Sequence, residues 1–184
     1  MARILVPLAE GCEELEAVTI IDLLRRARFE VVVAGLREGP VKASRGVVLM
    51  PDTTLDTVLG ESFDMVVLPG GMPGAENLDQ DPRIHRLLQR MAEEGGHIAA
   101  ICAAPKVLAN AGLLDGRQAT SFPGFIDGMG LPTTRVLADP VVIDGRVVTS
   151  RGPGTAMDFA LTLIEILAGR EARDQVEAPL QRPH

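Results

Sequence analysis

The chain has 184 residues, of which 46% are hydrophobic, and its 18 basic and 25 acidic side chains leave a formal net charge of −7. A chain of this length buries roughly 70% of its unfolded surface, so we expect one compact domain over residues 1–184. The hydrophobic content excludes a disordered chain. No apolar run reaches the ~18 residues of a membrane span or forms a signal peptide, so we expect a cytoplasmic protein without a membrane partner. The negative charge and the absence of Trp and Tyr argue against nucleic acid as a partner.

Short runs of Val, Ile and Leu alternate with helical patterns along the chain, which is typical of parallel strands covered by helices on both faces. We expect strands at residues 3–8, 29–35, 47–50, 65–68, 97–101, 141–143 and 147–149. Asp144 and Gly145 separate the last two and indicate a small antiparallel hairpin.

Helices are expected at residues 12–27, 82–93, 105–111, 155–167 and 170–177. Asp81 before Pro82 is typical of a helix start, and Thr155 with Asp158 resembles a capping box. The order of elements predicts a doubly wound α/β domain. Ligands of such sheets bind beyond the carboxyl ends of the strands, which directs attention to residues 9–16, 69–74 and 102–105.

Cys102 directly follows the predicted strand 97–101 and comes shortly before Pro105. A thiol at a strand-to-helix turn lies near the positive end of a helix dipole, which favours the thiolate and predicts a lowered pKa. The small neighbours Ala103 and Ala104 permit a sharp turn like the nucleophile elbow of hydrolases. The alternative is an inert buried cysteine, because free cysteines are among the most buried residues.

Glu16 lies on the apolar stripe of the first predicted helix, together with Ile20, Leu23 and Ala27. A carboxyl on the buried side is desolvated, which raises its pKa and suits it to proton transfer with a thiol. Glu13 is less well aligned and Glu14 points away, so we interpret both as first-turn acids that complement the helix dipole.

Gly70 and Gly71 follow the predicted strand 65–68. Consecutive glycines let backbone N–H groups approach a ligand closely, and with the N–H of Ala103 they are candidates for holding an oxyanion. A purely structural turn is the alternative.

Histidine is absent from this predicted site. His97 begins the strand that Cys102 follows, roughly 15 Å away at the opposite end of the sheet. We assign His85 and His184 to structural or solvated roles. A Cys–His dyad is therefore not expected, and Glu16 is the better partner for Cys102.

Cys12 opens the first predicted helix at the same sheet edge as Cys102. It is a candidate accessory thiol that resolves an oxidised Cys102 as a disulfide, although Glu13 and Glu14 disfavour its thiolate. Two cysteines in a cytosolic chain otherwise indicate free thiols.

With these motifs in order, the chain resembles the ThiJ/PfpI superfamily, and within it the parkinsonism-associated deglycase branch with its bacterial YajL-type members. The matching motifs are GCEELE at 11–16, SR at 44–45, LPGG at 68–71, AAICAAP at 99–105 and TSRGPGT at 149–155. The resemblance implies a flavodoxin-like fold, a homodimer, a nucleophilic Cys102 hydrogen-bonded to Glu16, and neither cofactor nor metal. Members with His directly after the cysteine are proteases, whereas this chain has Ala103 there. It also has Phe122 where some relatives place a histidine.

The resemblance implies glutathione-independent glyoxalase chemistry on methylglyoxal and glyoxal, and deglycation of their adducts on proteins and nucleotides. In the mechanism that we expect, the Cys102 thiolate adds to a carbonyl, the amides stabilise the oxyanion, and Glu16 moves protons until lactate or glycolate is released. Arg45 and Arg151 are candidates for the substrate edge, with solvated surface arginines as the alternative.

A different class of function remains open for the same residues. In this alternative the protein is a non-catalytic redox sensor or holdase chaperone that responds through oxidation of Cys102 to the sulfinate. We also expect a twofold dimer through the first helix and residues 47–50, because Val18, Ile21 and Leu24 lie outside the Glu16 face.

Overall fold

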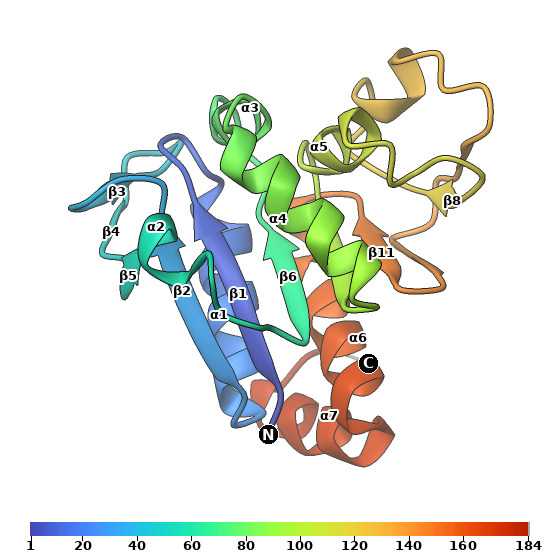
Figure 1. Cartoon of the computed structure of the whole chain (residues 1–184). Helices are drawn as coiled ribbons and strands as arrows, with labels where there is room; N and C mark the ends of the chain where they lie inside the picture. Colours follow the sequence, from blue (N-terminus) through green and yellow to red (C-terminus); the bar gives the residue numbers. More distant parts are fainter. Residues whose placement is uncertain (184) are drawn as a thin grey trace.

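A computed structural model describes residues 1–183, and His184 lies outside the described residues. Its central sheet has the strand order β10-β11-β7-β6-β1-β2-β5 (Figure 1). The strands are β1 (Arg3–Leu8), β2 (Glu30–Gly35), β5 (Thr53–Thr54), β6 (Met65–Leu68), β7 (His97–Ile101), β10 (Val141–Asp144) and β11 (Val147–Ser150). All neighbours are parallel except β10 and β11, which form the predicted antiparallel hairpin. The predicted mostly parallel α/β sheet is therefore confirmed.

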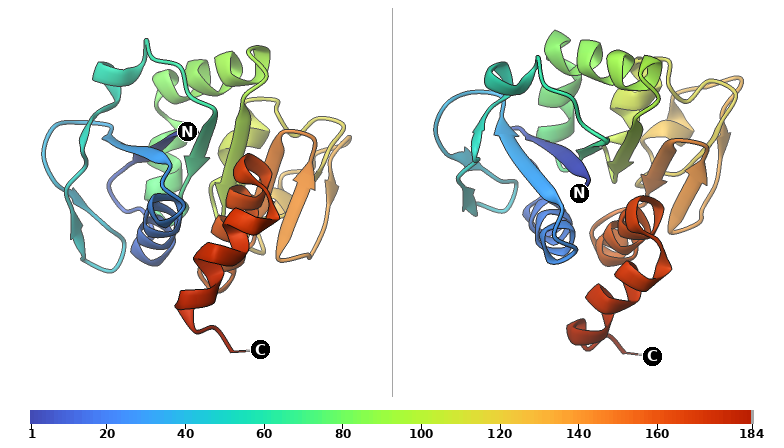
Figure 2. Two further views of the ribbon diagram at one scale, coloured as in Figure 1. Left: turned by 90° about the horizontal axis from the view of Figure 1, so that it is seen from below. Right: turned by 60° about the horizontal axis from the view of Figure 1, so that its bottom comes forward.

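Helices cover both faces of this sheet, as Figure 2 shows from below. One face packs against α1 (Glu14–Arg26), α6 (Ala156–Ala168) and α7 (Arg170–Glu177), and the other against α2 (Leu55–Val58), α3 (Gly74–Asp79), α4 (Pro82–Glu93) and α5 (Pro105–Asn110). Strand β1 contributes Ile4 and Val6 to the first face and Leu5 to the second. Burial on both faces explains why these strands are continuous apolar runs in the sequence.

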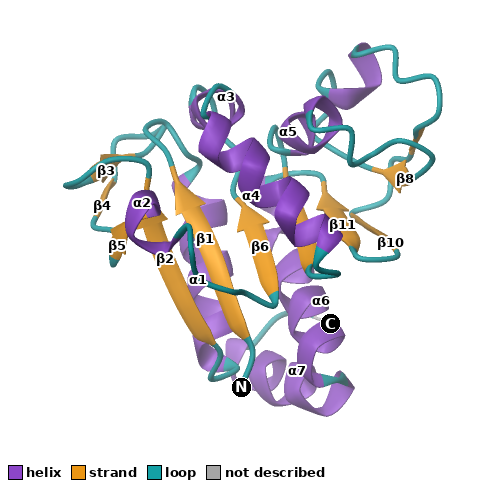
Figure 3. Cartoon of the chain, viewed as in Figure 1, coloured by secondary structure: helices purple, strands orange, loops and turns teal. Residues whose placement is uncertain are grey.

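Shorter elements surround the main layers (Figure 3). Strands β3 (Val41–Lys42) and β4 (Val48–Leu49) form an antiparallel pair, and β8 (Gln118–Ala119) and β9 (Arg135–Val136) form a parallel pair. Single 3₁₀ turns lie at Ile126–Gly128, Pro153–Thr155 and Ala178–Leu180. Among residues 1–183, no helix has both the length and the apolar composition that a membrane crossing requires.

The predicted strand at residues 47–50 is wrong as a strand of the central sheet. Residues Val48 and Leu49 pair with β3 instead, and the edge of the main sheet is β5. Val47, Val48 and Met50 are 48%, 61% and 72% exposed, so their apolar pattern does not mark a buried strand. The short helices α2 and α3 were not predicted.

Two helix starts differ from the sequence prediction. The first helix begins at Glu14 rather than at residue 12, because Glu13 is the N-cap and its carboxylate accepts the N–H of Leu15. The predicted capping box of Thr155 and Asp158 is also wrong. The Thr155 hydroxyl instead bonds the backbone of Gly152, and α6 starts one residue later.

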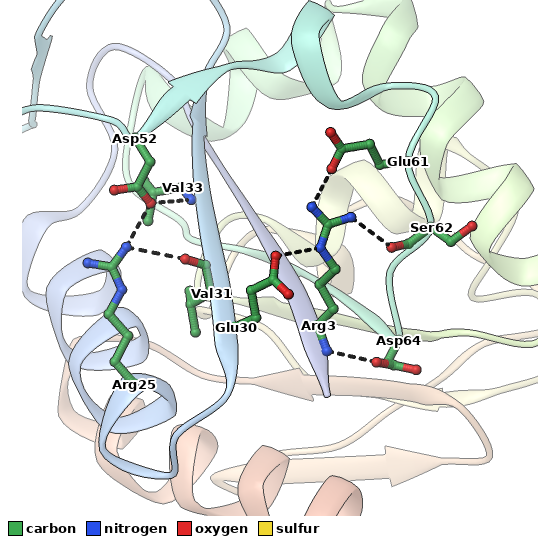
Figure 4. A network of polar contacts seen from close by, with 9 residues as sticks. All are labelled: Arg3, Arg25, Glu30, Val31, Val33, Asp52, Glu61, Ser62 and Asp64. Atoms are coloured by element: carbon green, nitrogen blue, oxygen red, sulfur yellow. Dashed lines mark hydrogen bonds and ion pairs between the residues drawn. The ribbon is translucent and has the colours of Figure 1, made fainter. Parts of the chain in front are cut away.

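The amino-terminal edge of the sheet is held by ion pairs (Figure 4). Arg3 donates through Nε to Glu30 at 2.7 Å and through its backbone N–H to Asp64 at 2.7 Å, which joins the starts of β1, β2 and β6. Arg25 donates to Asp52 at 2.7 Å. These charged groups neutralise one another in pairs.

Candidate active site

Cys102 lies at a strained turn between β7 and α5. Its φ angle is +64°, in the left-handed region that costs a residue with a side chain roughly 1–3 kcal/mol. Two backbone hydrogen bonds hold it there: its N–H donates to Ser150 O at 3.0 Å, and its carbonyl accepts from Phe122 N at 2.9 Å. The side chain is 8% exposed. The sharp turn predicted from the small neighbours is therefore present, and it aims the sulfur at a cavity.

Glu16 is completely buried in the first turn of α1. Its Oε2 accepts the N–H of Gly70 at 2.8 Å, and its Oε1 has no conventional hydrogen-bond partner among the described residues. Burial raises the pKa of the Glu16 carboxyl to about 7, while interactions with the Cys102 thiol and with Gly70 N–H lower it in part. The burial of Glu16 and its raised pKa agree with the predicted buried carboxyl near Cys102.

The expected lowering of the Cys102 pKa is wrong. Burial, followed by the charge of Glu16 and its hydrogen bond, raises the pKa of the Cys102 thiol to about 12. The N–H groups of Gly71 and Ala103 lower it, but by less. The helix that follows has only six residues and exerts little dipole, so desolvation outweighs it. Glu16 is the carboxyl next to this thiol and is the candidate proton acceptor.

Gly70 and Gly71 make different contacts in the turn after β6. A methyl group on Gly70 would lie 2.6 Å from Cys102 Cβ and 2.7 Å from Ile101 O, and one on Gly71, whose φ is +88°, would lie 2.3 Å from Glu13 N. Both positions therefore require glycine. The N–H of Gly70 is used by Glu16, which removes Gly70 from the expected oxyanion donors. Gly71 and Ala103 line the same cavity as Cys102, and their N–H groups favour the Cys102 thiolate by lowering the pKa of the thiol.

A cavity of about 230 Å³ opens above the sulfur. It is lined by Glu13, Ser44, Arg45, Gly71, Met72, Cys102, Ala103, Phe122, Phe125 and Pro153. A larger cavity of about 580 Å³ lies beside Leu36 and Arg83 and shares none of these residues. We assign the chemistry to the smaller cavity because it contains the nucleophile.

The two candidate arginines are placed differently. Arg45 is exposed and lines the cavity. Arg151 donates through Nη1 to Ala138 O at 3.1 Å, and it is not part of the cavity lining. Only Arg45 therefore stands at the edge of the site.

Cys12 is 1% exposed and does not line the cavity. Burial, followed by the charge of Glu14, raises the pKa of its thiol to about 12. Both Cys12 and Cys102 are free thiols in this structure.

Glu14 has a role that the sequence prediction missed. Far from pointing into solvent, it is buried, and its Oε1 accepts the N–H of Arg45 at 2.8 Å and that of Val47 at 3.4 Å. Its Oε2 accepts the Ser44 hydroxyl at 3.1 Å. Burial by itself would raise its pKa, but these hydrogen bonds together lower it. Glu14 thus holds the segment that carries Arg45 to the cavity.

Phe125 and Met72 were also missed as cavity residues, because no local pattern links them to Cys102. The two histidines within residues 1–183 lie elsewhere, as expected, and His184 lies outside the described residues. His97 starts β7 at the far end from Cys102, and His85 contacts Asp79 O at 2.8 Å. Within residues 1–183, no three metal-ligating side chains gather at one point.

Comparison with known proteins places this site in context. The model of the DJ-1/PfpI family matches residues 2–166. Protein dj-1beta of Drosophila melanogaster is 46% identical over 173 residues, covering 94% of this chain and 92% of that protein. The glutathione-independent glyoxalase DJR-1.2 of Caenorhabditis elegans is 40% identical over 97% of this chain and 95% of its own. The crystal structure of Drosophila DJ-1beta superposes with a TM-score of 0.95 and 44% identity, with both chains fully covered.

Proposed function

Because the chain belongs to the DJ-1/PfpI family, we propose that it is a cysteine-dependent, glutathione-independent glyoxalase that acts on methylglyoxal and glyoxal. The proposal extends to deglycation, in which the same steps remove the adducts of methylglyoxal and glyoxal from proteins and nucleotides. One observation carries it: the completely buried carboxyl of Glu16 and the side chain of Cys102 meet at Gly70, where an added methyl group would lie 2.9 Å from Glu16 Oε2 and 2.6 Å from Cys102 Cβ. The activity in the name of the C. elegans relative supports the same chemistry.

The first step is addition of sulfur to the aldehyde carbon. The Glu16 carboxylate takes the thiol proton as the S–C bond forms, and the carbonyl electron pair moves to oxygen. The N–H groups of Gly71 and Ala103 stabilise this oxyanion, and Glu16 returns the proton to it. A hemithioacetal on Cys102 results. The pKa of about 7 suits Glu16 to both directions of transfer near neutral pH.

The second stage is an internal redox rearrangement that needs no external oxidant. Glu16 removes the proton from the former aldehyde carbon, a proton is returned to the adjacent carbon, and the hydroxyl proton passes to the oxygen of the second carbonyl. The second carbonyl thereby becomes an alcohol, and a thioester remains on Cys102. Water then attacks the thioester carbonyl, the C–S bond breaks, and the thiol regains its proton. Methylglyoxal yields lactate, and glyoxal yields glycolate.

The experiment is a lactate assay with methylglyoxal in the absence of glutathione. Wild type is expected to make lactate over many turnovers, and Cys102→Ser is expected to make none above background. Cys12→Ser is the matched control and should retain turnover, because Cys12 does not line the cavity. Full turnover by Cys102→Ser would refute the proposal.

Peroxide sensing is the second candidate function, and the same N–H groups support it. In this reaction two peroxide molecules each transfer one oxygen to the Cys102 sulfur and leave as water, and Gly71 and Ala103 bind the sulfinate oxygens. A related solved structure, at 40% identity, is that of Toxoplasma gondii DJ-1 in an oxidized form. Stoichiometric uptake of two oxygens at Cys102, without turnover of either dicarbonyl, would favour this function over the first.

The proposal includes a twofold homodimer. Leu15 and Val18 on α1 are 51% and 47% exposed, and Val47, Val48 and Met50 are exposed as well. Several exposed large apolar side chains of this kind favour burial against a partner subunit. Leu24, which the sequence analysis assigned to the dimer, is fully buried within the protomer and is not available for it.

A further inference from the structure

Phe122 is a large apolar side chain exposed at the mouth of the catalytic cavity. It is 46% exposed and lines the cavity together with Cys102. Its backbone N–H donates to the Cys102 carbonyl at 2.9 Å. The position of Phe122 is therefore tied to the turn that carries the nucleophile.

The ring of Phe122 is supported from two sides. Phe125 meets it edge-on, with ring centroids 6.3 Å apart and an interplanar angle of 78°. Below it lies Gly152, where a methyl group would stand 3.1 Å from Phe122 Cδ2 and 4.0 Å from Cys102 Sγ. The ring and the sulfur thus flank the same glycine, and both residues line the cavity.

Apolar side chains dominate this part of the rim. Met72, which is 48% exposed, and Pro153 join Phe122 and Phe125 in the cavity lining. The charged lining residues, Glu13 and Arg45, belong to other segments of the chain than these apolar side chains. A substrate bound to Cys102 therefore has an apolar surface available for the substituent that does not react.

We infer that Phe122, supported by Phe125 and Met72, is a specificity-determining residue that favours 2-oxoaldehydes with an apolar alkyl or aryl group on the ketone carbon over unsubstituted glyoxal. The inference rests on the proposed glyoxalase function. An aromatic substituent gains contact with the exposed Phe122 ring that glyoxal lacks, and aromatic pairs are stabilising beyond the area they bury. Such a contact is expected to change the ratio of the kcat/KM values of the two substrates by roughly tenfold.

The test compares kcat/KM for phenylglyoxal and for glyoxal in variants of the full chain. In Phe122→Ala the phenylglyoxal-to-glyoxal ratio is expected to fall about tenfold, because only phenylglyoxal loses the contact with the aromatic ring. Phe122→Leu keeps an apolar surface and is expected to lose only about threefold. Ile143→Ala is the matched control, since Ile143 is 54% exposed but lies on β10 outside the cavity. An unchanged ratio in Phe122→Ala, with turnover of both substrates, overturns the inference and leaves the proposed function intact.

A second readout decides the inference if wild type turns over neither substrate, an outcome that overturns the proposed function instead. Cys102 is alkylated with N-benzyl iodoacetamide or with iodoacetamide, each of which forms an S–C bond and releases iodide and the thiol proton. Peptide mapping by mass spectrometry separates Cys102 from Cys12. A several-fold fall of the ratio of the benzyl to the unsubstituted alkylation rate in Phe122→Ala supports the inferred role of Phe122 in selecting apolar substituents, and an unchanged ratio overturns it.

Discussion

The N–H of Gly70 donates to Glu16 Oε2 at 2.8 Å, although the two residues are 54 positions apart. This bond orients the buried carboxyl, whose Oε1 has no conventional hydrogen-bond partner among the described residues. The glycine turn therefore acts on the thiol through Glu16 as well as through the N–H of Gly71.

Glu16→Gln tests the proton-transfer role of this carboxyl. The amide keeps the size of the side chain but cannot take the thiol proton, so lactate formation from methylglyoxal is expected to fall about 10²- to 10⁴-fold. In wild type, kcat/KM is expected to rise as the pH increases through about 7, because Glu16 must be ionised to act as the base. A variant that keeps both the rate and this pH profile would contradict the mechanism.

The stability of wild type is expected to decline with rising pH over the same range. Glu16 has a pKa of about 7 when folded and an ordinary value of 4.5, so between these values the folded state binds more protons than the unfolded state. The contribution of Glu16 to the free energy of unfolding is therefore greatest below pH 4.5. Above pH 7 the loss of this contribution approaches the order of 3 kcal/mol. Urea unfolding at a series of pH values measures it. The difference in unfolding free energy between wild type and Glu16→Gln isolates the contribution of Glu16. If the two proteins show the same dependence of stability on pH, Glu16 is not its cause.

Gly70→Ala tests the close approach between the β6 turn and the nucleophile. The added methyl would lie 2.6 Å from Cys102 Cβ, so the turn must shift, with an expected loss of roughly 1–3 kcal/mol and of most lactate formation. Gly60→Ala is the matched control, because a methyl there meets nothing within 4 Å and should change stability by less than about 0.5 kcal/mol. Thermal unfolding compares the two, and equal effects would rule out the packing explanation.

Glu14→Ala tests how the Arg45 segment is held. Removal of a carboxylate that accepts hydrogen bonds from Ser44, Arg45 and Val47 is expected to cost about 2 kcal/mol. Hydrogen exchange at the Arg45 and Val47 amides should accelerate more than exchange elsewhere. Asp22→Ala, which removes only an exposed ion pair on the same helix, serves as the control. Unchanged protection of both amides would show that Glu14 does not hold the segment.

Val18→Asp and Met50→Asp test the proposed dimer. Both side chains are exposed in the protomer, so a charge should leave the fold intact while destabilising a buried apolar interface. Sedimentation velocity is expected to give a dimer for wild type and monomers for these variants. Ile143→Asp, an exposed apolar position on β10, should remain dimeric. A monomeric wild type would refute the dimer.

The parallel strands and the place of the nucleophile were predictable because their causes are local. Strands buried on both faces must be continuous apolar runs, and Cys102 follows such a run directly. Glu16 was recognisable because helical periodicity puts it on the same stripe as Ile20 and Leu23, and all three are buried. The prediction of a central strand at residues 47–50 failed because a run of apolar residues can also lie on an exposed surface, as it does here.

The sequence by itself determined the layered fold, the glycine turn and the pairing of a cysteine with a buried carboxyl. Only the tertiary structure decided that the Cys102 pKa is raised rather than lowered, that Gly70 serves Glu16, and that Glu14 faces inward. The physical reason is that desolvation and hydrogen-bond geometry depend on which distant segments meet. Periodicity reports which face of an element is buried, but not which polar atom from another part of the chain lies against it.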